Sequence, residues 1–155
     1  MKKYIKKCYF YIVILVFAIA LIGCGKKKNN IDCEARHMYQ GNFFITCLDY
    51  AKTFNCPIYI LSAKYGLLSL NTVISPYDKT LNNMNREESL CWARYVKQQF
   101  DENHLENEKA IFLCGENYYK YLLDYFEEYE LPLKGLHGMG YQIQYMKSKM
   151  KRRLF

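Results

Sequence analysis

The segment from residue 8 to residue 28 constrains this chain more than any other part of its sequence. Residues 1–7 include four lysines, residues 8–23 carry no charge, and Cys24-Gly25-Lys26-Lys27-Lys28 follows directly. A cationic start, an apolar stretch and Leu-Ile-Gly-Cys are together typical of a bacterial lipidation signal. On that interpretation, cleavage would make Cys24 the lipidated N-terminus of an exported protein.

The same residues also fit the first strand and first loop of an α/β domain, with Cys24 and the lysines facing a ligand. A buried strand needs about 5 or 6 residues. The uncharged run is longer, and it approaches the roughly 17 residues of the shortest membrane-spanning helices. We therefore predict an apolar N-terminal extension over residues 1–17, signal-like or anchor-like, and a strand over residues 18–23. Any membrane contact would be made through residues 8–24.

Length and charge bound the function. A chain of 155 residues, half of it apolar, is enough for one domain with a real core. Residues 1–28 hold seven lysines and no acid, and residues 147–153 hold five basic residues and no acid, which leaves ten basic residues against all 15 acidic ones between them. Basic ends on an acidic body favour contact with an anionic surface at the termini over a broad DNA-binding face.

The seven cysteines contain no Cys-x-x-Cys pair. Cys33 and His37 form a single close pair with no second pair to complete a site, so we expect no metal. Several cysteines lie in apolar segments, where free thiols commonly serve as small buried groups. Unpaired thiols suit a reducing compartment, which favours a cytoplasmic protein over an exported one.

Apolar periodicity divides the rest of the chain into alternating elements. We expect strands over residues 57–61 and 110–115, and helices over residues 42–54, 86–100, 117–129 and 141–153. This alternation predicts a single three-layer α/β/α domain over residues 18–155, with a short, mainly parallel central sheet. The sheet needs residues 18–23 as its third strand, because two strands cannot bury helices on both sides.

The loops that leave these strands carry candidate site residues, because ligands bind beyond the carboxyl ends of strands in open α/β sheets. Cys24 and Lys28 follow the first strand, and Ser62, Lys64 and Tyr65 follow the second. Lysines beside a small-residue turn could hold a phosphate. A solvated lysine run is the more common structure for such a sequence, and the spacing of a Walker loop is missing.

Lys64 sits in uncharged surroundings and would need an acidic partner, for which Asp78 is the candidate. This pair would act in catalysis or would simply pin the loop, and the sequence favours neither. Arg36 and Tyr39 could clamp an anion and stack on a ring, although an Arg at a helix entry is more often a surface cap. His137, in a glycine-rich loop, is a weaker candidate.

A series of ordered sequence blocks resembles an uncharacterised bacterial and phage domain family. The blocks lie within residues 18–146 and occupy 24–28, 35–41, 60–68, 76–81, 112–115 and 135–144. That family is similar to the peroxide-stress protein YaaA and, more distantly, to the glycosylase-like domain of archaeosine synthases. The resemblance implies a uracil-DNA-glycosylase-like fold with a nucleobase or nucleoside pocket formed by Cys24, Lys28, Arg36, Tyr39, Ser62, Lys64, Tyr65, Pro76, Tyr77 and Asp78.

We therefore predict a cytoplasmic domain that binds a nucleobase, nucleoside, nucleotide or nucleic acid and needs no cofactor. If it is an enzyme of base modification or N-glycosidic chemistry, Asp78 would orient water or stabilise positive charge on the sugar, with Lys64 or Lys28 at a phosphate. One alternative is a membrane-anchored or lipoprotein interaction module without catalysis. Another is a DNA-binding stress protein whose affinity falls steeply with salt.

Overall fold

The last six residues of the apolar segment form the central strand of the protein. The computed structural model describes residues 17–153, and the strand predicted over residues 18–23 is confirmed as β1 (Ala18–Gly23). The predicted extension over residues 1–17 lies outside the described residues except for Phe17, which is exposed. Within residues 17–153, no helix is both long and apolar enough to cross a membrane.

The central sheet has five strands in the order β4-β3-β1-β6-β7. The bounds of the other four strands are Ile58–Ser62 for β3, Gly66–Ser69 for β4, Lys109–Leu113 for β6 and Tyr129–Glu130 for β7. β1 pairs in parallel with β3 and β6, β7 runs parallel to β6, and β4 is antiparallel to β3. The expected mainly parallel sheet is therefore confirmed. A second, antiparallel sheet pairs β2 (Cys33–Glu34) with β5 (Val73–Ile74).

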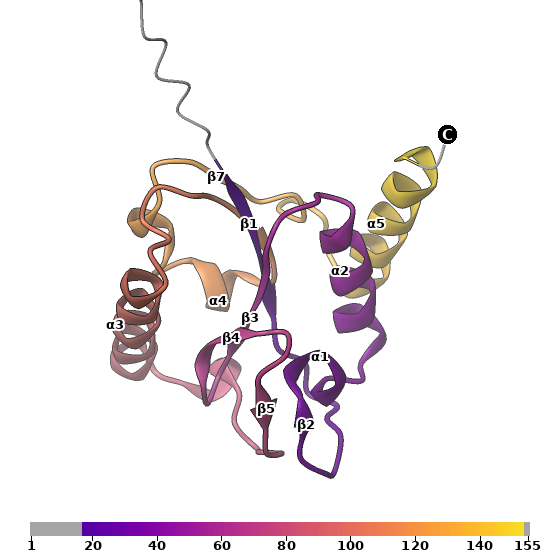
Figure 1. The fold of residues 1–155 in the computed structure, drawn as a ribbon. Helices are drawn as coiled ribbons and strands as arrows, with labels where there is room; N and C mark the ends of the chain where they lie inside the picture. The colour runs from indigo at the N-terminus through magenta and orange to yellow at the C-terminus, as the bar shows by residue number, and fades with distance from the viewer. Residues whose placement is uncertain (1–16, 154–155) are drawn as a thin grey trace, which may run out of the picture.

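Helices cover both faces of the large sheet (Figure 1). Along β1, Ile19 and Leu21 point into the core under α3 (Arg86–Glu102). Ala20 and Ile22 point to the opposite core, under α2 (Asn42–Lys52) and α5 (Met139–Arg153). A strand buried on both faces reads as a continuous apolar run, which explains why the sequence of β1 also looks like a signal segment.

The long helices form where their periodicity predicts them. Asn85 caps α3 through a capping box, since its side chain accepts from the Glu88 N–H at 2.9 Å while the Glu88 carboxylate accepts from the Asn85 N–H at 2.8 Å. Short helical turns fill the connections. They are α1 (Ala35–Met38), α4 (Glu116–Tyr119) and the 3-10 turns η1 (Leu81–Asn83) and η2 (Leu123–Tyr125).

The helix predicted over residues 117–129 is wrong. The chain makes only the short turns α4 and η2 there and then enters β7. The Glu128 carbonyl accepts from the Ala110 N–H at 3.0 Å, and Tyr129 pairs with Ala110. Pairing along the open edge of β6 thus satisfies backbone groups that a continuous helix would leave exposed. The aromatic side chains still pack inward, as Phe126 does against Phe112.

Candidate functional site

A cavity of about 1070 Å³ opens at the carboxyl ends of β1 and β6. Its wall comes from five separate parts of the chain, namely residues 23–28, 41–44, 78–83, 114–118 and 139–143. The loops after β1 and β6 meet here because their strands are parallel neighbours in the sheet. The other segments are the first turns of α2 and α5 and the connection before α3. The cavity therefore lies where ligands bind in open α/β sheets.

The chemistry of the cavity wall is cationic, aromatic and rich in amides. Four lysines line it, against the two carboxylates of Asp78 and Glu116, and none of these six groups takes part in a described ion pair. Phe43, Phe44 and Tyr118 supply aromatic surface. The amides are those of Asn42, Asn82, Asn83, Asn117 and Gln142. The wall can therefore contact an anionic group, a flat ring and hydrogen-bonding ring edges at once.

A chain of three hydroxyls lies beside the cavity. The Tyr77 hydroxyl is 2.8 Å from both the Ser62 Oγ and the Tyr39 hydroxyl. The Ser62 Oγ also accepts from the backbone N–H groups of Lys64 and Tyr65, at 3.3 and 3.1 Å. Because these two bonds use its acceptor sites, Ser62 donates its own proton to Tyr77. Tyr77 is the centre of this network.

Two lysines lie on the tyrosine rings of the network. The Lys28 Nζ is 4.5 Å from the centroid of the Tyr77 ring. The Lys64 Nζ is 5.0 Å from the Tyr65 centroid and 6.0 Å from that of Tyr77. Such contacts orient ammonium groups by cation–π attraction without neutralising their charge. Both lysines remain able to attract an anion.

The expected ion pair between Lys64 and Asp78 is wrong, since none of the ion pairs within residues 17–153 joins them. Lys64 is exposed and rests on tyrosine rings, so it needs no carboxylate. Asp78 is exposed and lines the cavity. The loop places Tyr77 against Lys64, and its neighbour Asp78 lines the cavity wall.

Burial keeps the phenols of this region neutral. Burial first, and then the neighbouring Cys24, raise the pKa of Tyr39 to about 12. The pKa values of Tyr77 and Tyr118 are also raised, first by burial and then by the same thiol. At neutral pH these side chains therefore act as hydrogen-bonding groups and ring surfaces, and not as phenolate bases.

Cys24 joins the first loop to the loop after β6. Its Sγ is 3.2 Å from the Tyr118 hydroxyl, which donates to the Cys24 carbonyl oxygen at 3.1 Å. Gly23 permits this close approach, because a Cβ at Gly23 would lie 2.9 Å from the Cys114 Cβ. The two strands thus hold the thiol and the phenol together in the wall of the cavity.

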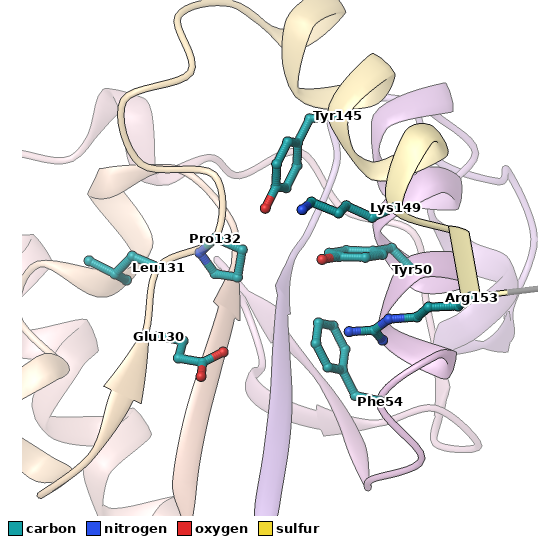
Figure 2. A pocket seen from close by; sticks show the side chains of 8 residues that line it. All are labelled: Tyr50, Phe54, Glu130, Leu131, Pro132, Tyr145, Lys149 and Arg153. Atoms are coloured by element: carbon teal, nitrogen blue, oxygen red, sulfur yellow. The ribbon is translucent and has the colours of Figure 1, made fainter. Parts of the chain in front are cut away.

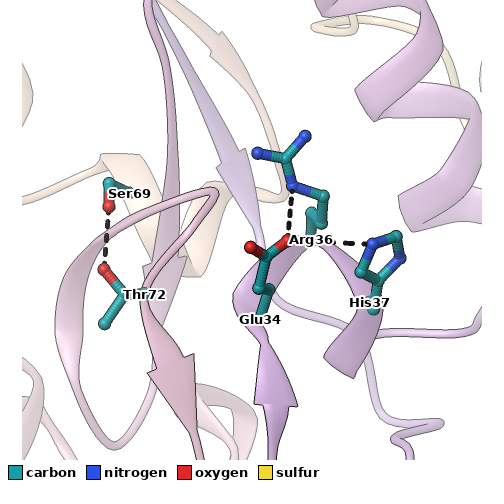
Figure 3. Close-up of polar contacts among 5 residues, drawn as sticks. All are labelled: Glu34, Arg36, His37, Ser69 and Thr72. Carbon is teal, nitrogen blue, oxygen red and sulfur yellow. Dashed lines mark hydrogen bonds and ion pairs between the residues drawn. The ribbon is translucent and has the colours of Figure 1, made fainter.

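Arg36 does not form the predicted clamp with Tyr39. Its Nε lies 3.2 Å from the Glu34 Oε2, and the Nε2 of His37 is 3.9 Å from the same oxygen (Figure 3). The Arg36 N–H donates to the Leu70 carbonyl, and the nearby turn is closed by the 2.8 Å contact between Ser69 and Thr72. Arg36 therefore belongs to the small β2-β5 unit.

The ten predicted residues separate into three groups. Cys24, Lys28 and Asp78 line the cavity. Behind them, the hydroxyl network and the lysine contacts bring together Tyr39, Ser62, Lys64, Tyr65 and Tyr77. Arg36 and Pro76 line no part of the cavity, and neither does the exposed His137.

Sequence reasoning missed much of the cavity wall. Asn42 and Phe43 come from the first turn of α2, and Gln142 comes from α5. In the sequence these residues are ordinary members of amphipathic helices, and only the packing of α2 beside α5 brings them to the loops. Tyr118 also lines the cavity, and its place soon after a strand and Gly115 is a usable sequence signal. Among residues 17–153, no group of three His, Cys, Asp or Glu side chains could hold a metal ion.

The fold and the cavity define an α/β protein with a cationic, aromatic site at the carboxyl ends of parallel strands. The sequence profile described as "Family of unknown function (DUF6884)" matches residues 19–148, and the chain belongs to this family. It is similar to the "Uncharacterized protein YfjM" of Bacillus subtilis (strain 168), with 31% identity over 137 residues, which cover 81% of this chain and 90% of that protein. No solved structure matches the chain at a significant level. Membership of an uncharacterised family is thus confirmed, and the likeness to YaaA and archaeosine synthases stays a prediction.

Proposed function

We propose that the cavity binds a nucleobase-containing ligand, as a free nucleobase, a nucleoside or a nucleotide. One observation carries the proposal, namely that a cavity of about 1070 Å³ combines aromatic side chains, side-chain amides and lysines without described ion pairs. Its volume slightly exceeds the usual range for small-molecule sites, about 300–1,000 Å³. A purely apolar ligand would make no use of the lysines or of the amides of Asn42 and Asn83. A simple anion would leave the aromatic surface unused.

Each part of such a ligand has a matching group in the cavity. Phe43 offers a ring for stacking, and Asn42 and Asn83, whose side chains make no described hydrogen bond, offer amides for the polar edge of a base. Lys26 and Lys27 lie in the exposed loop after β1, where they can meet a phosphate. Gly25 brings the backbone of this loop close to the ligand. The hydroxyl network behind the wall holds the loops in place.

Asp78 supports an extension of the proposal to N-glycosidic chemistry. It is the exposed carboxylate of the loop that carries Tyr77. In hydrolysis, a water molecule would add to the anomeric carbon as the C–N bond breaks. Asp78 would take a proton from that water and return it to the ring nitrogen of the departing base, so that the hydroxyl stays on the sugar and the base leaves neutral. Lys64, which does not line the cavity, would then position Tyr77 and would not contact the reacting atoms.

The experiment is a titration of the full chain with each of the four deoxynucleoside monophosphates, followed by calorimetry and thermal shift. We expect saturable binding that weakens about tenfold in the double variant Lys26→Gln/Lys27→Gln, because two phosphate contacts are lost. Lys120→Gln is the matched control, since Lys120 is exposed and lies outside the cavity wall. Equal losses in both variants, or no saturable binding, would overturn the proposal. Asp78→Asn should retain binding and lose any base release.

We also propose that the working chain is cytoplasmic and keeps its first strand, with membrane association through residues 8–24 as an added property. The central position of β1 supports this, because cleavage before Cys24 would remove a strand that is paired on both sides. The exported lipoprotein is the alternative. Both are distinguished by the N-terminal mass of the protein in soluble and membrane fractions.

A further inference from the structure

A second, smaller hollow lies at the other end of α5 from the cavity (Figure 2). It has a volume of about 440 Å³ and takes its aromatic walls from Tyr50 of α2, Phe54 just after α2 and Tyr145 of α5. Lys149 and Arg153 of α5 line the same hollow, and Pro132 faces them. We call this hollow the α5 niche. The uncharacterised relatives suggest no role for the niche, and the niche shares no residue with the cavity.

Arg153 is held flat against the aromatic wall of the niche. Its guanidinium carbon is 4.7 Å from the Phe54 centroid and 5.9 Å from the Tyr50 centroid. One guanidinium nitrogen donates to the Thr53 Oγ1 at 2.6 Å and to the Thr53 carbonyl at 3.1 Å. The Lys149 Nζ lies 5.4 Å from the Tyr145 centroid. Both cations are therefore oriented by rings.

The charge of the niche is positive. Neither Lys149 nor Arg153 takes part in any ion pair described for residues 17–153. The one carboxylate in the wall belongs to Glu130, which is already bound to Lys109 at 2.6 Å. The niche thus offers two cations, Lys149 and Arg153, to an anion, and its aromatic wall offers ring surface to a flat group. Cations interleaved with stacking surfaces are typical of binding to single-stranded nucleic acid.

α5 connects the niche to the cavity. Gln142 lines the cavity, and Tyr145, Lys149 and Arg153 line the niche. Their steps of three and four residues place all of them on one face of the helix. The ten steps from Ile143 to Arg153 span about 15 Å along the helix. α5 also carries five basic residues and no acidic one, so an anionic chain that leaves the cavity along α5 meets only favourable charge.

We propose that the α5 niche is a second nucleotide subsite, which holds a phosphate and a base of a single-stranded nucleic acid while another nucleotide of that strand occupies the cavity. The proposal rests on the proposed function, because it makes the ligand of the cavity part of a strand. An anionic membrane surface could also attract the basic end of α5. A flat surface would not use a hollow walled by rings, which favours the nucleic acid.

The test measures binding of a fluorescent single-stranded oligonucleotide of about 12 nucleotides, within the range of small single-strand-binding folds, to the full chain. DNA and RNA of the same sequence are compared. We expect Lys149→Gln/Arg153→Gln to weaken binding about tenfold and to reduce the slope of log affinity against log salt by about 1.4, as the loss of two phosphate contacts requires. Binding of deoxynucleoside monophosphates at the cavity should not change.

Lys151→Gln/Arg152→Gln is the matched control, because it removes the same charge from the same exposed end of α5 without touching the niche. It should weaken oligonucleotide binding less than about threefold, as expected of cations without a phosphate contact. Arg153→Lys keeps the charge and loses the planar stacking, so it should also weaken binding. Melting temperatures of all variants identify any that fail to fold, and Arg153→Lys then serves as the readout.

The outcomes separate the two proposals. If monophosphates bind at the cavity but the oligonucleotide binds no more tightly, or the niche and control variants lose the same affinity, the niche proposal fails and the proposed function stands. If oligonucleotide binding depends on the niche and no monophosphate binds, the niche is a nucleic-acid site, but the proposed function fails and so does the joint occupation of cavity and niche by one strand. Binding to phosphatidylserine vesicles that depends on Lys149 and Arg153, without oligonucleotide binding, overturns the niche proposal in favour of a membrane.

Discussion

Tyr77 makes more of the described contacts in the hydroxyl network than its neighbours do. Its hydroxyl is 2.8 Å from those of Ser62 and Tyr39, and its ring carries Lys28 at 4.5 Å. The sequence does not reveal that the hydroxyls of Tyr39, Ser62 and Tyr77 form a network, because the three residues lie in separate parts of the chain. The three groups meet because Ser62 ends β3 beside β1, Tyr39 pairs with Lys28 in the loop after β1, and the loop after β5 carries Tyr77.

We expect Tyr77→Phe to lower the free energy of unfolding by about 1–3 kcal/mol, because Ser62 and Tyr39 would lose a partner in a largely buried setting. Urea denaturation followed by circular dichroism measures this change. Tyr121→Phe is the control, since no hydrogen bond is described for the Tyr121 hydroxyl, and it should stay within about 0.5 kcal/mol of the parent. Similar losses in the two variants would contradict the role given to the network.

The raised pKa of Tyr39 predicts a loss of stability in alkali. Its pKa is about 12 in the folded protein, against 10.0 for an ordinary tyrosine. Because the folded state holds this proton more tightly, the contribution is complete below pH 10 and is lost as the pH rises toward 12. The free energy of unfolding should therefore fall over this interval. Tyr39→Phe should have a shallower fall than the parent, and identical pH profiles would argue against burial of an intact phenol.

At the scale of the element, the turn between β3 and β4 depends on one glycine. Gly66 has a φ of 71°, and a Cβ there would strike the side chain of Gln99. That side chain accepts from the Leu67 N–H at 2.8 Å and donates to the Tyr65 carbonyl at 3.2 Å. α3 thus holds the hairpin of β3 and β4, which contains Ser62 and Lys64. A side chain at Gly66 would push this hairpin away from α3.

Gly66→Ala should destabilise the protein by about 1–3 kcal/mol, because alanine is strained at positive φ and would displace Gln99. Gly140→Ala gives the opposite expectation. Gly140 is exposed within α5 with open space around it, so alanine should stabilise the helix by about 0.5–1 kcal/mol. Thermal unfolding of both variants measures the contrast. A harmless Gly66→Ala would mean that the turn can change its conformation.

The segment from residue 117 to residue 129 illustrates how an element departs from its pattern. Its tyrosines recur at helical spacing, yet they form two short turns and the edge strand β7. Periodicity reports which side chains are buried, and Leu122 and Phe126 are indeed buried. It does not report the backbone partners, which here lie on β6 across more than a dozen residues of chain. Long-range pairing therefore overrode the local pattern.

At the scale of the whole molecule, β1 decides whether the protein folds. Ile19, Ala20, Leu21 and Ile22 are each no more than 1% exposed, and the strand pairs on both sides. A chain that begins at Cys24 would lose the centre of both cores. A chain that begins at Phe17 would keep every described contact of β1.

We expect a variant that lacks residues 1–16 to unfold cooperatively near the melting temperature of the parent, and a variant that lacks residues 1–23 to show no cooperative transition. Ile19, Leu21 and Ile22 each contribute about 1.5–3 kcal/mol by burial, and their loss together with the backbone pairing of β1 on both sides is comparable to the whole stability of an ordinary domain, about 5–15 kcal/mol. Differential scanning calorimetry provides the measurement. If a protein that starts at Cys24 folds, β1 is not required for folding. The lipidated form would then be the functional one.

The sequence by itself determined the α/β class, the existence and limits of β1 and the capped helix α3, because apolar periodicity and capping are local properties of the chain. It also pointed to the loops after the strands as the place of the site. Only the tertiary structure decided that Lys64 rests on tyrosines and not on Asp78, that Arg36 pairs with Glu34, and that α2 and α5 complete the cavity. These contacts join residues far apart in the chain, and their partners depend on how strands and helices pack in space.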